Sequence, residues 1–160
     1  MEIHTPSVLF ICTANICRSP MAEGLFKALV REEFKDTMPW RIESAGTWTR
    51  NGLSAAPYSI QVMAERGIDI SNHQTRTIEE INLEEFDLIL TMESGHKEAI
   101  QVEFPEARDR VFMLSELIKQ KTPIFDPVGL PIEVFRKTAD HIDQILCDGF
   151  PVILQKINFK

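Results

Sequence analysis

The sequence predicts an α/β fold in which helices cover both faces of a small, doubly wound, parallel sheet. Short apolar segments of strand length alternate with amphipathic segments of helix length along the 160 residues. The first apolar run, residues 7–12, is continuous, which is typical of a strand that is buried on both faces. No repeat, low-complexity segment or linker divides the chain, so we expect one domain over residues 1–160.

The first strand is expected at residues 7–12, followed by a loop and a helix. Ser19 and Pro20 are typical of a helix start, with the hydroxyl as N-cap and the proline at the first helical position. The apolar residues that follow share one helical face: Met21, Leu25, Ala28 and Leu29.

Three further strands are expected at residues 40–45, 86–92 and 110–114. Connected by right-handed crossovers, the four strands form a parallel sheet, for which we expect the order 2-1-3-4. In such sheets ligands bind beyond the carboxyl ends of the strands. The segment after residue 12 leaves the first strand at that edge, so we expect it to contribute to a ligand-binding site.

Helices are expected at residues 57–66, ended by Gly67, and at residues 94–102. Apolar residues at steps of three and four predict a long last helix at 131–147.

Breakers follow the last helix. Gly149 and Pro151 are expected to end it before a short tail, and Cys147, at its end, is expected to be structural.

Composition argues against several classes of protein. The formal net charge of −7 is unfavourable for a broad nucleic-acid surface. No apolar run approaches the roughly 18 residues of a membrane helix, and the amino-terminal residues lack the pattern of a secretory leader. Three cysteines, an odd number, do not suggest a disulfide framework. We therefore expect a cytoplasmic protein without a nucleic-acid or membrane partner.

The loop from Cys12 to Arg18 has the features of an anion site. Its backbone N–H groups can turn inward, and the N-terminus of the following helix adds its partial positive charge at the same point. These groups and the Arg18 guanidinium favour a Cys12 thiolate, a strong nucleophile. Arg18 offers a planar fork that matches two phosphate oxygens. Ser19 is a candidate donor to the thiolate, a role that competes with capping the helix.

A leaving oxygen needs a proton donor, and Asp126 is the candidate. It lies beside Pro127 in a proline-rich loop at residues 122–131, before the last helix. From the residues alone, an ordinary Asp-Pro turn explains this dipeptide equally well.

The stretch from Cys12 to Pro20 resembles the Cys-x5-Arg-Ser signature of the low-molecular-weight protein tyrosine phosphatases. The likeness covers nearly the whole chain, including residues 43–47, residues 87–92 and the late Asp-Pro. It implies a flavodoxin-like fold, with Cys12 as nucleophile, Arg18 as phosphate clamp, Ser19 as thiolate partner and Asp126 as general acid. The phosphate-binding loop would consist of Thr13, Ala14, Asn15, Ile16, Cys17 and Arg18.

The resemblance also implies supporting roles. Asn15, which tolerates the left-handed conformation, would bond Ser44 and His73 and so hold the loop together. Cys17 would be a second loop cysteine able to form a reversible disulfide with Cys12.

The pocket wall departs from the family pattern. An aromatic residue usually follows Asp-Pro in this family, whereas here Val128 does. Trp48 stands where the family's second loop supplies an aromatic wall, and Ile16 is the third residue expected in the pocket wall.

No combination of side chains has metal-ligand spacing, so we expect metal-free chemistry without a cofactor.

We therefore expect hydrolysis of protein phosphotyrosine through a phosphocysteine, with a phosphotyrosine protein or peptide as substrate and phosphate or other oxyanions bound in the loop.

One alternative is a protein arginine phosphatase, although such relatives carry Thr where this chain has Ile16. An arsenate reductase is less favoured because residues 75–100 contain no cysteine for an electron relay. A phosphopeptide-binding module would need neither Cys12 nor Asp126.

Overall fold

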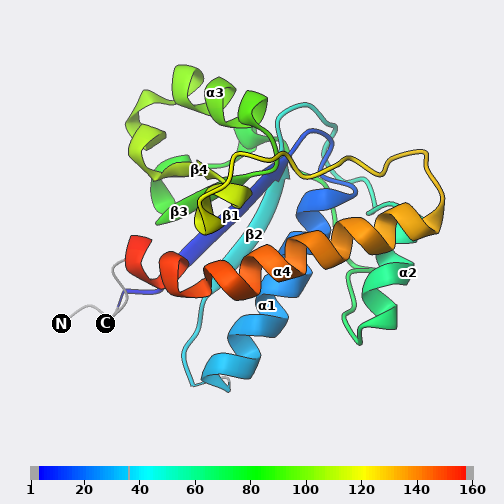
Figure 1. Cartoon of the computed structure of the whole chain (residues 1–160). Helices are drawn as coiled ribbons and strands as arrows, with labels where there is room; N and C mark the ends of the chain where they lie inside the picture. The colour runs from blue at the N-terminus through cyan, green and yellow to red at the C-terminus, as the bar shows by residue number, and fades with distance from the viewer. Residues whose placement is uncertain (1–3, 36, 158–160) are drawn as a thin grey trace.

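The structure, a computed structural model, describes residues 4–35 and 37–157 (Figure 1). Its centre is a four-stranded parallel sheet with the order β2-β1-β3-β4, which confirms the predicted topology. The strands are β1 (Ser7–Cys12), β2 (Arg41–Gly46), β3 (Leu88–Thr91) and β4 (Val111–Met113). Each lies within a residue or two of its expected range.

Four α-helices surround the sheet: α1 (Arg18–Phe34), α2 (Pro57–Glu65), α3 (Ser94–Glu103) and α4 (Ile132–Lys156). Helices α1 and α4 pack against each other, with α2 beside them, and α3 lies across the sheet from them (Figure 1). Short 3-10 turns complete the connections at Ile78–Glu80, Leu83–Glu85, Pro105–Arg110 and Leu114–Ile118. The fold is therefore doubly wound, as predicted.

The sheet separates the core into two layers, and the side chains of β1 alternate between them. Val8, Phe10 and Cys12 point to the layer that α1 and α4 cover. Leu9 and Ile11 point to the opposite layer, which includes residues of α3. All six residues of β1 are buried, which explains why its sequence is continuously apolar rather than alternating.

The prediction that Gly149 and Pro151 end the last helix is wrong, because α4 continues to Lys156. A Cβ on Gly149 would lie 2.7 Å from the Leu117 Cβ, so the glycine permits close packing rather than ending the helix. Beyond it, Phe150 packs on Trp40 and Ile153 is fully buried. Burial of this extra apolar surface offsets the cost of about 3 kcal/mol for a proline within a helix.

Two smaller predictions are also corrected. Helix α1 begins at Arg18, two residues before the expected first helical residue Pro20, because the Met21 N–H already donates to the Cys17 carbonyl at 3.3 Å. Ser19 is therefore inside the first turn and does not cap the helix. Cys147 lies within α4, not at its end, and its side chain is exposed.

No helix within the described residues is long and apolar enough to cross a membrane.

Candidate active site

The loop between β1 and α1 folds around the sulfur of Cys12. The Asn15 N–H donates to this sulfur at 3.3 Å, and the Ser19 Oγ lies 3.0 Å from it. Asn15 has φ of 60°, the left-handed conformation expected for it. Because the backbone reverses at Asn15, the loop from Thr13 to Cys17 encircles the end of β1 and delivers Arg18 and Ser19 to the same place.

The direction of the Ser19 hydrogen bond follows from its neighbours. The Asn15 side-chain amide donates to the Ser19 Oγ at 2.7 Å, so that oxygen acts as an acceptor there. The Ser19 hydroxyl hydrogen is then available for the Cys12 sulfur. The Asn15 N–H and the Ser19 hydroxyl are therefore both directed at the Cys12 sulfur.

Asn15 connects the loop to two other segments. Its side-chain oxygen accepts the Arg76 N–H at 3.0 Å, which fixes the amide so that its nitrogen faces Ser19 and Ser44. The bond to the Ser44 Oγ is 3.0 Å long, and the His73 Nε2 lies 2.7 Å from the Asn15 carbonyl oxygen. The loop is therefore held by a buried hydroxyl from β2 and by partly buried groups of residues 73–76.

The end of β2 approaches the loop closely. Cys12 pairs with Gly46 across the sheet, and the next N–H groups, those of Thr47 and Trp48, donate to the carbonyls of Cys12 and Thr13, each at 3.0 Å. A Cβ on Gly46 would lie 2.5 Å from the Thr13 carbonyl oxygen. Only glycine fits here without displacing the loop.

Arg18 is 2 % exposed, yet its guanidinium reaches the site. The Nη1 atom donates to Glu93 Oε2 at 2.7 Å and to the Ile124 carbonyl at 2.9 Å. The Nη2 atom lies 3.6 Å from Asp126 Oδ2. These contacts engage both hydrogens of Nη1, so the remaining N–H groups of the fork are the ones available for an oxyanion.

A pocket of about 290 Å³ opens above this loop. It brings together the side chains that the sequence analysis selected for chemistry and for the pocket wall: Cys12, Ile16, Arg18, Trp48, Asp126 and Val128. Trp48 is 83 % exposed, so its ring stands at the rim rather than in the interior. Asp126, about 42 % exposed, is oriented by the Val128 N–H, which donates to its Oδ1 at 3.2 Å.

Two residues at this edge were missed by the sequence analysis. Glu93 pairs with Arg18, and the His96 Nε2 lies 2.9 Å from the Thr13 Oγ1. Burial and the nearby Arg18 charge lower the pKa of His96 from its usual value of 6.5, so its ring is neutral at pH 7. A signal was present, because Glu93 follows directly on a predicted strand at the carboxyl edge of the sheet and His96 lies in the first turn of the helix that comes next.

Cys17 differs chemically from Cys12. Burial, and then the charges of Asp126 and Cys12, raise the pKa of Cys17 from 9.0 to about 12. Its thiol is therefore protonated at neutral pH and is not the nucleophile of this loop. At Cys17 the burial and the neighbouring negative charges outweigh the Ser59 hydrogen bond and the Arg18 charge, which lower its pKa.

Within the described residues, no group of three or more His, Cys, Asp or Glu side chains is arranged to hold a metal ion. The Glu93, His96 and Asp126 side chains instead surround a guanidinium cation.

A family model described as low molecular weight phosphotyrosine protein phosphatase matches residues 7–157. The chain belongs to this family. The match spans β1 to α4 and includes the entire site, so the resemblance predicted from the Cys12–Pro20 stretch is confirmed.

Proteins similar to the chain differ in the activity that their names state. A protein-arginine-phosphatase of Bacillus subtilis (strain 168) is 34 % identical over 140 residues, which is 87 % of this chain and 91 % of the relative. A probable low molecular weight protein-tyrosine-phosphatase, EpsP, of Ralstonia nicotianae is 33 % identical, covering 86 % of this chain and 89 % of the relative. The crystal structure of a low molecular weight protein tyrosine phosphatase from T. tengcongensis superposes with a TM-score of 0.85 at 35 % identity, covering 92 % and 99 % of the two chains.

Proposed function

We propose that the protein hydrolyses protein phosphotyrosine through a phosphocysteine formed on Cys12. The observation that carries this proposal is the pocket, which gathers a doubly hydrogen-bonded cysteine, a buried arginine and an aspartate under an apolar wall. A phosphate monoester with an apolar leaving group suits such a pocket. The proposed cellular location is the cytoplasm, and the proposed domain is the whole chain, residues 1–160.

In the first step, the Cys12 sulfur forms a bond to phosphorus while the bond from phosphorus to the leaving oxygen breaks. Asp126 gives its proton to that oxygen, so tyrosine leaves as a neutral phenol. The free N–H groups of Arg18 and the backbone N–H groups of the loop hold the other phosphate oxygens as their charge redistributes. Glu93 keeps the guanidinium in place throughout by binding its Nη1 side.

In the second step, water attacks the phosphorus and the Asp126 carboxylate takes its proton. The sulfur–phosphorus bond breaks, its electron pair returns to Cys12, and inorganic phosphate leaves. Ser19 donates to the departing sulfur, a role supported by the acceptor bond that Asn15 imposes on its oxygen. The cycle needs no metal or redox partner, because Cys12 and Asp126 return to their starting states.

Substrate choice depends on three side chains at the pocket wall. Ile16, Trp48 and Val128 supply apolar surface, which favours a phenyl ring over the polar guanidinium of phosphoarginine. Protein arginine phosphatase activity is the second candidate. It is supported by the similarity to arginine phosphatases and by Val128, which leaves one wall without an aromatic ring.

Cys17 has a proposed role in redox protection. After a peroxide has oxidised Cys12 to a sulfenic acid, the Cys17 sulfur would bond to the Cys12 sulfur while the sulfur–oxygen bond of Cys12 breaks, and the Cys17 thiol proton would leave with the hydroxide as water. A thiol reductant would then restore Cys12.

The test compares turnover of phosphotyrosine and phosphoarginine peptides of one sequence, with EDTA present and with Cys12→Ser as the blank. We expect faster cleavage of phosphotyrosine, no turnover by Cys12→Ser, and retained phosphate affinity in that variant. Asp126→Asn is expected to slow phosphotyrosine cleavage by about 100-fold or more. It should slow p-nitrophenyl phosphate less, because that leaving group needs less protonation.

Faster cleavage of phosphoarginine would mean that phosphoarginine is the preferred substrate, whereas the proposed mechanism would stand. Phosphate trapped on any residue other than Cys12 would overturn the mechanism. Absence of turnover with both peptides, together with tight peptide binding, would favour the phosphopeptide-binding alternative.

A further inference from the structure

Exposed apolar side chains are concentrated around the pocket mouth. Seven large hydrophobic side chains are exposed within the described residues, and Val102 on α3 is the only one outside two segments, residues 48–58 and 125–130. The six others are Trp48, Leu53, Tyr58, Phe125, Val128 and Leu130. Both segments contribute to the wall of the catalytic pocket, through Trp48 and Val128. Concentration of exposed apolar surface beside one pocket is typical of a binding surface.

Part of this surface is an open groove next to the catalytic pocket. The groove has a volume of about 710 Å³ and lies between the start of α2 and the segment that enters α4. Figure 1 shows the start of α4 beside α2. The residues that shape it are Pro57, Tyr58, Val128, Leu130, Pro131 and Phe135. Tyr58 and Phe135 form an edge-to-face pair with centroids 5.4 Å apart, so the floor is fixed.

The groove is continuous with the catalytic pocket. Val128 lines both, together with Cys12 and Asp126 in the pocket and with Leu130 in the groove. On the opposite wall, the Ala56 N–H donates to the Ile16 carbonyl at 2.8 Å, which ties the groove to the phosphate-binding loop. A polypeptide whose phosphorylated side chain enters the pocket therefore has its neighbouring residues at the groove.

We propose that this groove, shaped by Tyr58, Leu130 and Phe135, binds an apolar side chain of the phosphoprotein substrate, within three residues of the phosphorylated one. This inference rests on the proposed phosphatase function and adds to it a preference for substrate sequence. None of the eight lining residues is charged, so a charged side chain would lose its hydration without gaining a partner. A second copy of the chain is disfavoured as the occupant, because a stable interface uses about 20–30 residues a side.

The experiment uses peptides that carry the phosphorylated residue in a Gly/Ser background. One leucine is placed in turn at each of the three positions on either side. For the wild-type protein we expect one leucine position to raise kcat/KM by roughly tenfold over the leucine-free peptide. Leu130→Ser and Tyr58→Ser should abolish this gain while leaving turnover of p-nitrophenyl phosphate unchanged. Val102→Ser is the control, because it removes an exposed apolar side chain near the end of α3, outside the two segments that carry the other exposed apolar side chains.

Several outcomes would overturn the inference. It fails if no leucine position raises kcat/KM, or if Leu130→Ser and Tyr58→Ser retain the full gain. It also fails if the chain is dimeric in solution and both variants make it monomeric, because the groove would then bind a second copy. Loss of all turnover, including that of p-nitrophenyl phosphate, would contradict the proposed function instead. In that case, fluorescence anisotropy with the same peptides tests the groove without catalysis.

Discussion

The two ends of the sheet carry polar networks of different character. At the carboxyl end, the side chains that hold the loop are almost completely buried: Asn15, Arg18, Ser19 and Ser44 are at most 2 % exposed. Each of them has hydrogen-bond partners at 2.7–3.0 Å. Buried polar groups of this kind are costly when a partner is missing, so the network tolerates little change.

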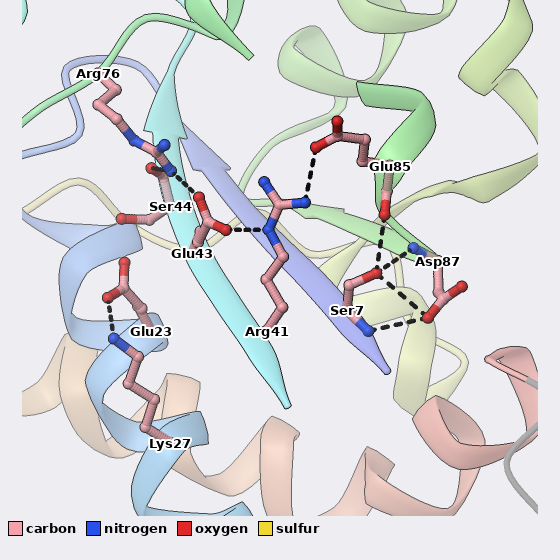
Figure 2. A network of polar contacts seen from close by, with 9 residues as sticks. All are labelled: Ser7, Glu23, Lys27, Arg41, Glu43, Ser44, Arg76, Glu85 and Asp87. Atoms are coloured by element: carbon pink, nitrogen blue, oxygen red, sulfur yellow. Dashed lines mark hydrogen bonds and ion pairs between the residues drawn. The ribbon is translucent and has the colours of Figure 1, made fainter. Parts of the chain in front are cut away.

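At the amino end, the network is partly open to solvent (Figure 2). Arg41, which is 38 % exposed, pairs with Glu43 and with Glu85, the latter 52 % exposed. Beside it, Ser7 and Asp87 exchange hydrogen bonds, with the Ser7 N–H donating to Asp87 at 2.9 Å. Ion pairs in such surroundings are screened by salt and contribute little to stability.

One chain of contacts joins the two ends. Arg41 and Arg76 both bind Glu43, as Figure 2 shows, and the Arg76 N–H in turn donates to the Asn15 side chain. Removing Arg41 leaves the Arg76–Glu43 pair intact, whereas removing Asn15 breaks contacts with several segments at once. We therefore expect the effect of a substitution on activity to depend on whether the residue contacts the phosphate-binding loop, and not on how many ion pairs it makes. The following substitutions test that view.

Gly46→Ala should have the largest effect. Its Cβ would meet the Thr13 carbonyl oxygen at 2.5 Å and push the loop away from β2. We expect kcat/KM to fall by about 100-fold, because a shift of about 1 Å misplaces the reacting groups. The free energy of unfolding should fall by about 1–3 kcal/mol. Enzyme kinetics and urea unfolding measure the two quantities.

Gly95→Ala is the matched control for this substitution. It lies in α3 with nothing within 4 Å of its added Cβ. We expect unchanged kcat/KM and a gain of about 0.5–1 kcal/mol in the free energy of unfolding. Equal losses in the two variants would show that the close approach of β2 does not position the loop.

Asn15→Ala should have the next largest effect on kcat/KM. It removes the side-chain hydrogen bonds of Asn15 to the Ser19 Oγ, the Ser44 Oγ and the Arg76 N–H, and it places alanine, which tolerates this conformation less well than asparagine, at φ of 60°. We expect a loss of roughly 3 kcal/mol in the free energy of unfolding and about a tenfold lower kcat/KM. Asn15→Gly removes the same bonds without backbone strain, so it should be more stable than Asn15→Ala by about 1 kcal/mol. Equal stability of these two variants would show that φ does not matter.

The sequence identified those parts of the fold and site that depend on local pattern. Strand β1, the loop from Cys12 to Arg18 and the start of α1 are consecutive in the sequence. Their contacts are therefore made between residues close in the chain, which a local sequence pattern can predict. Glu93 was missed because its contact with Arg18 exists only after β3 pairs with β1. The end of α4 was missed because the packing of Gly149 on Leu117 overrides a local breaker.

His96 offers a pH test of the carboxyl end. Its ring faces Thr13, Glu93, Arg18 and Asp126, and burial together with the Arg18 charge lowers its pKa. A lowered histidine pKa means that the unfolded state binds the proton more tightly, so stability is lost as the pH falls below 6.5. We expect the wild-type free energy of unfolding to fall more between about pH 7.5 and pH 5.5 than that of His96→Gln, which retains a donor for Thr13. Parallel urea unfolding series would measure this, and identical slopes would contradict the assignment.

Arg41→Met should have the smallest effect and is the sharpest test of the contrast between the two ends. It removes both ion pairs but retains an apolar stem over the Phe86 ring, which the guanidinium carbon approaches to 4.4 Å. We expect a loss below about 1 kcal/mol in the free energy of unfolding, smaller still in high salt, and unchanged kcat/KM. Because Arg76 holds Glu43 independently, a fall in kcat/KM would mean that the exposed network positions the loop after all, and the two ends of the sheet would then act as one unit.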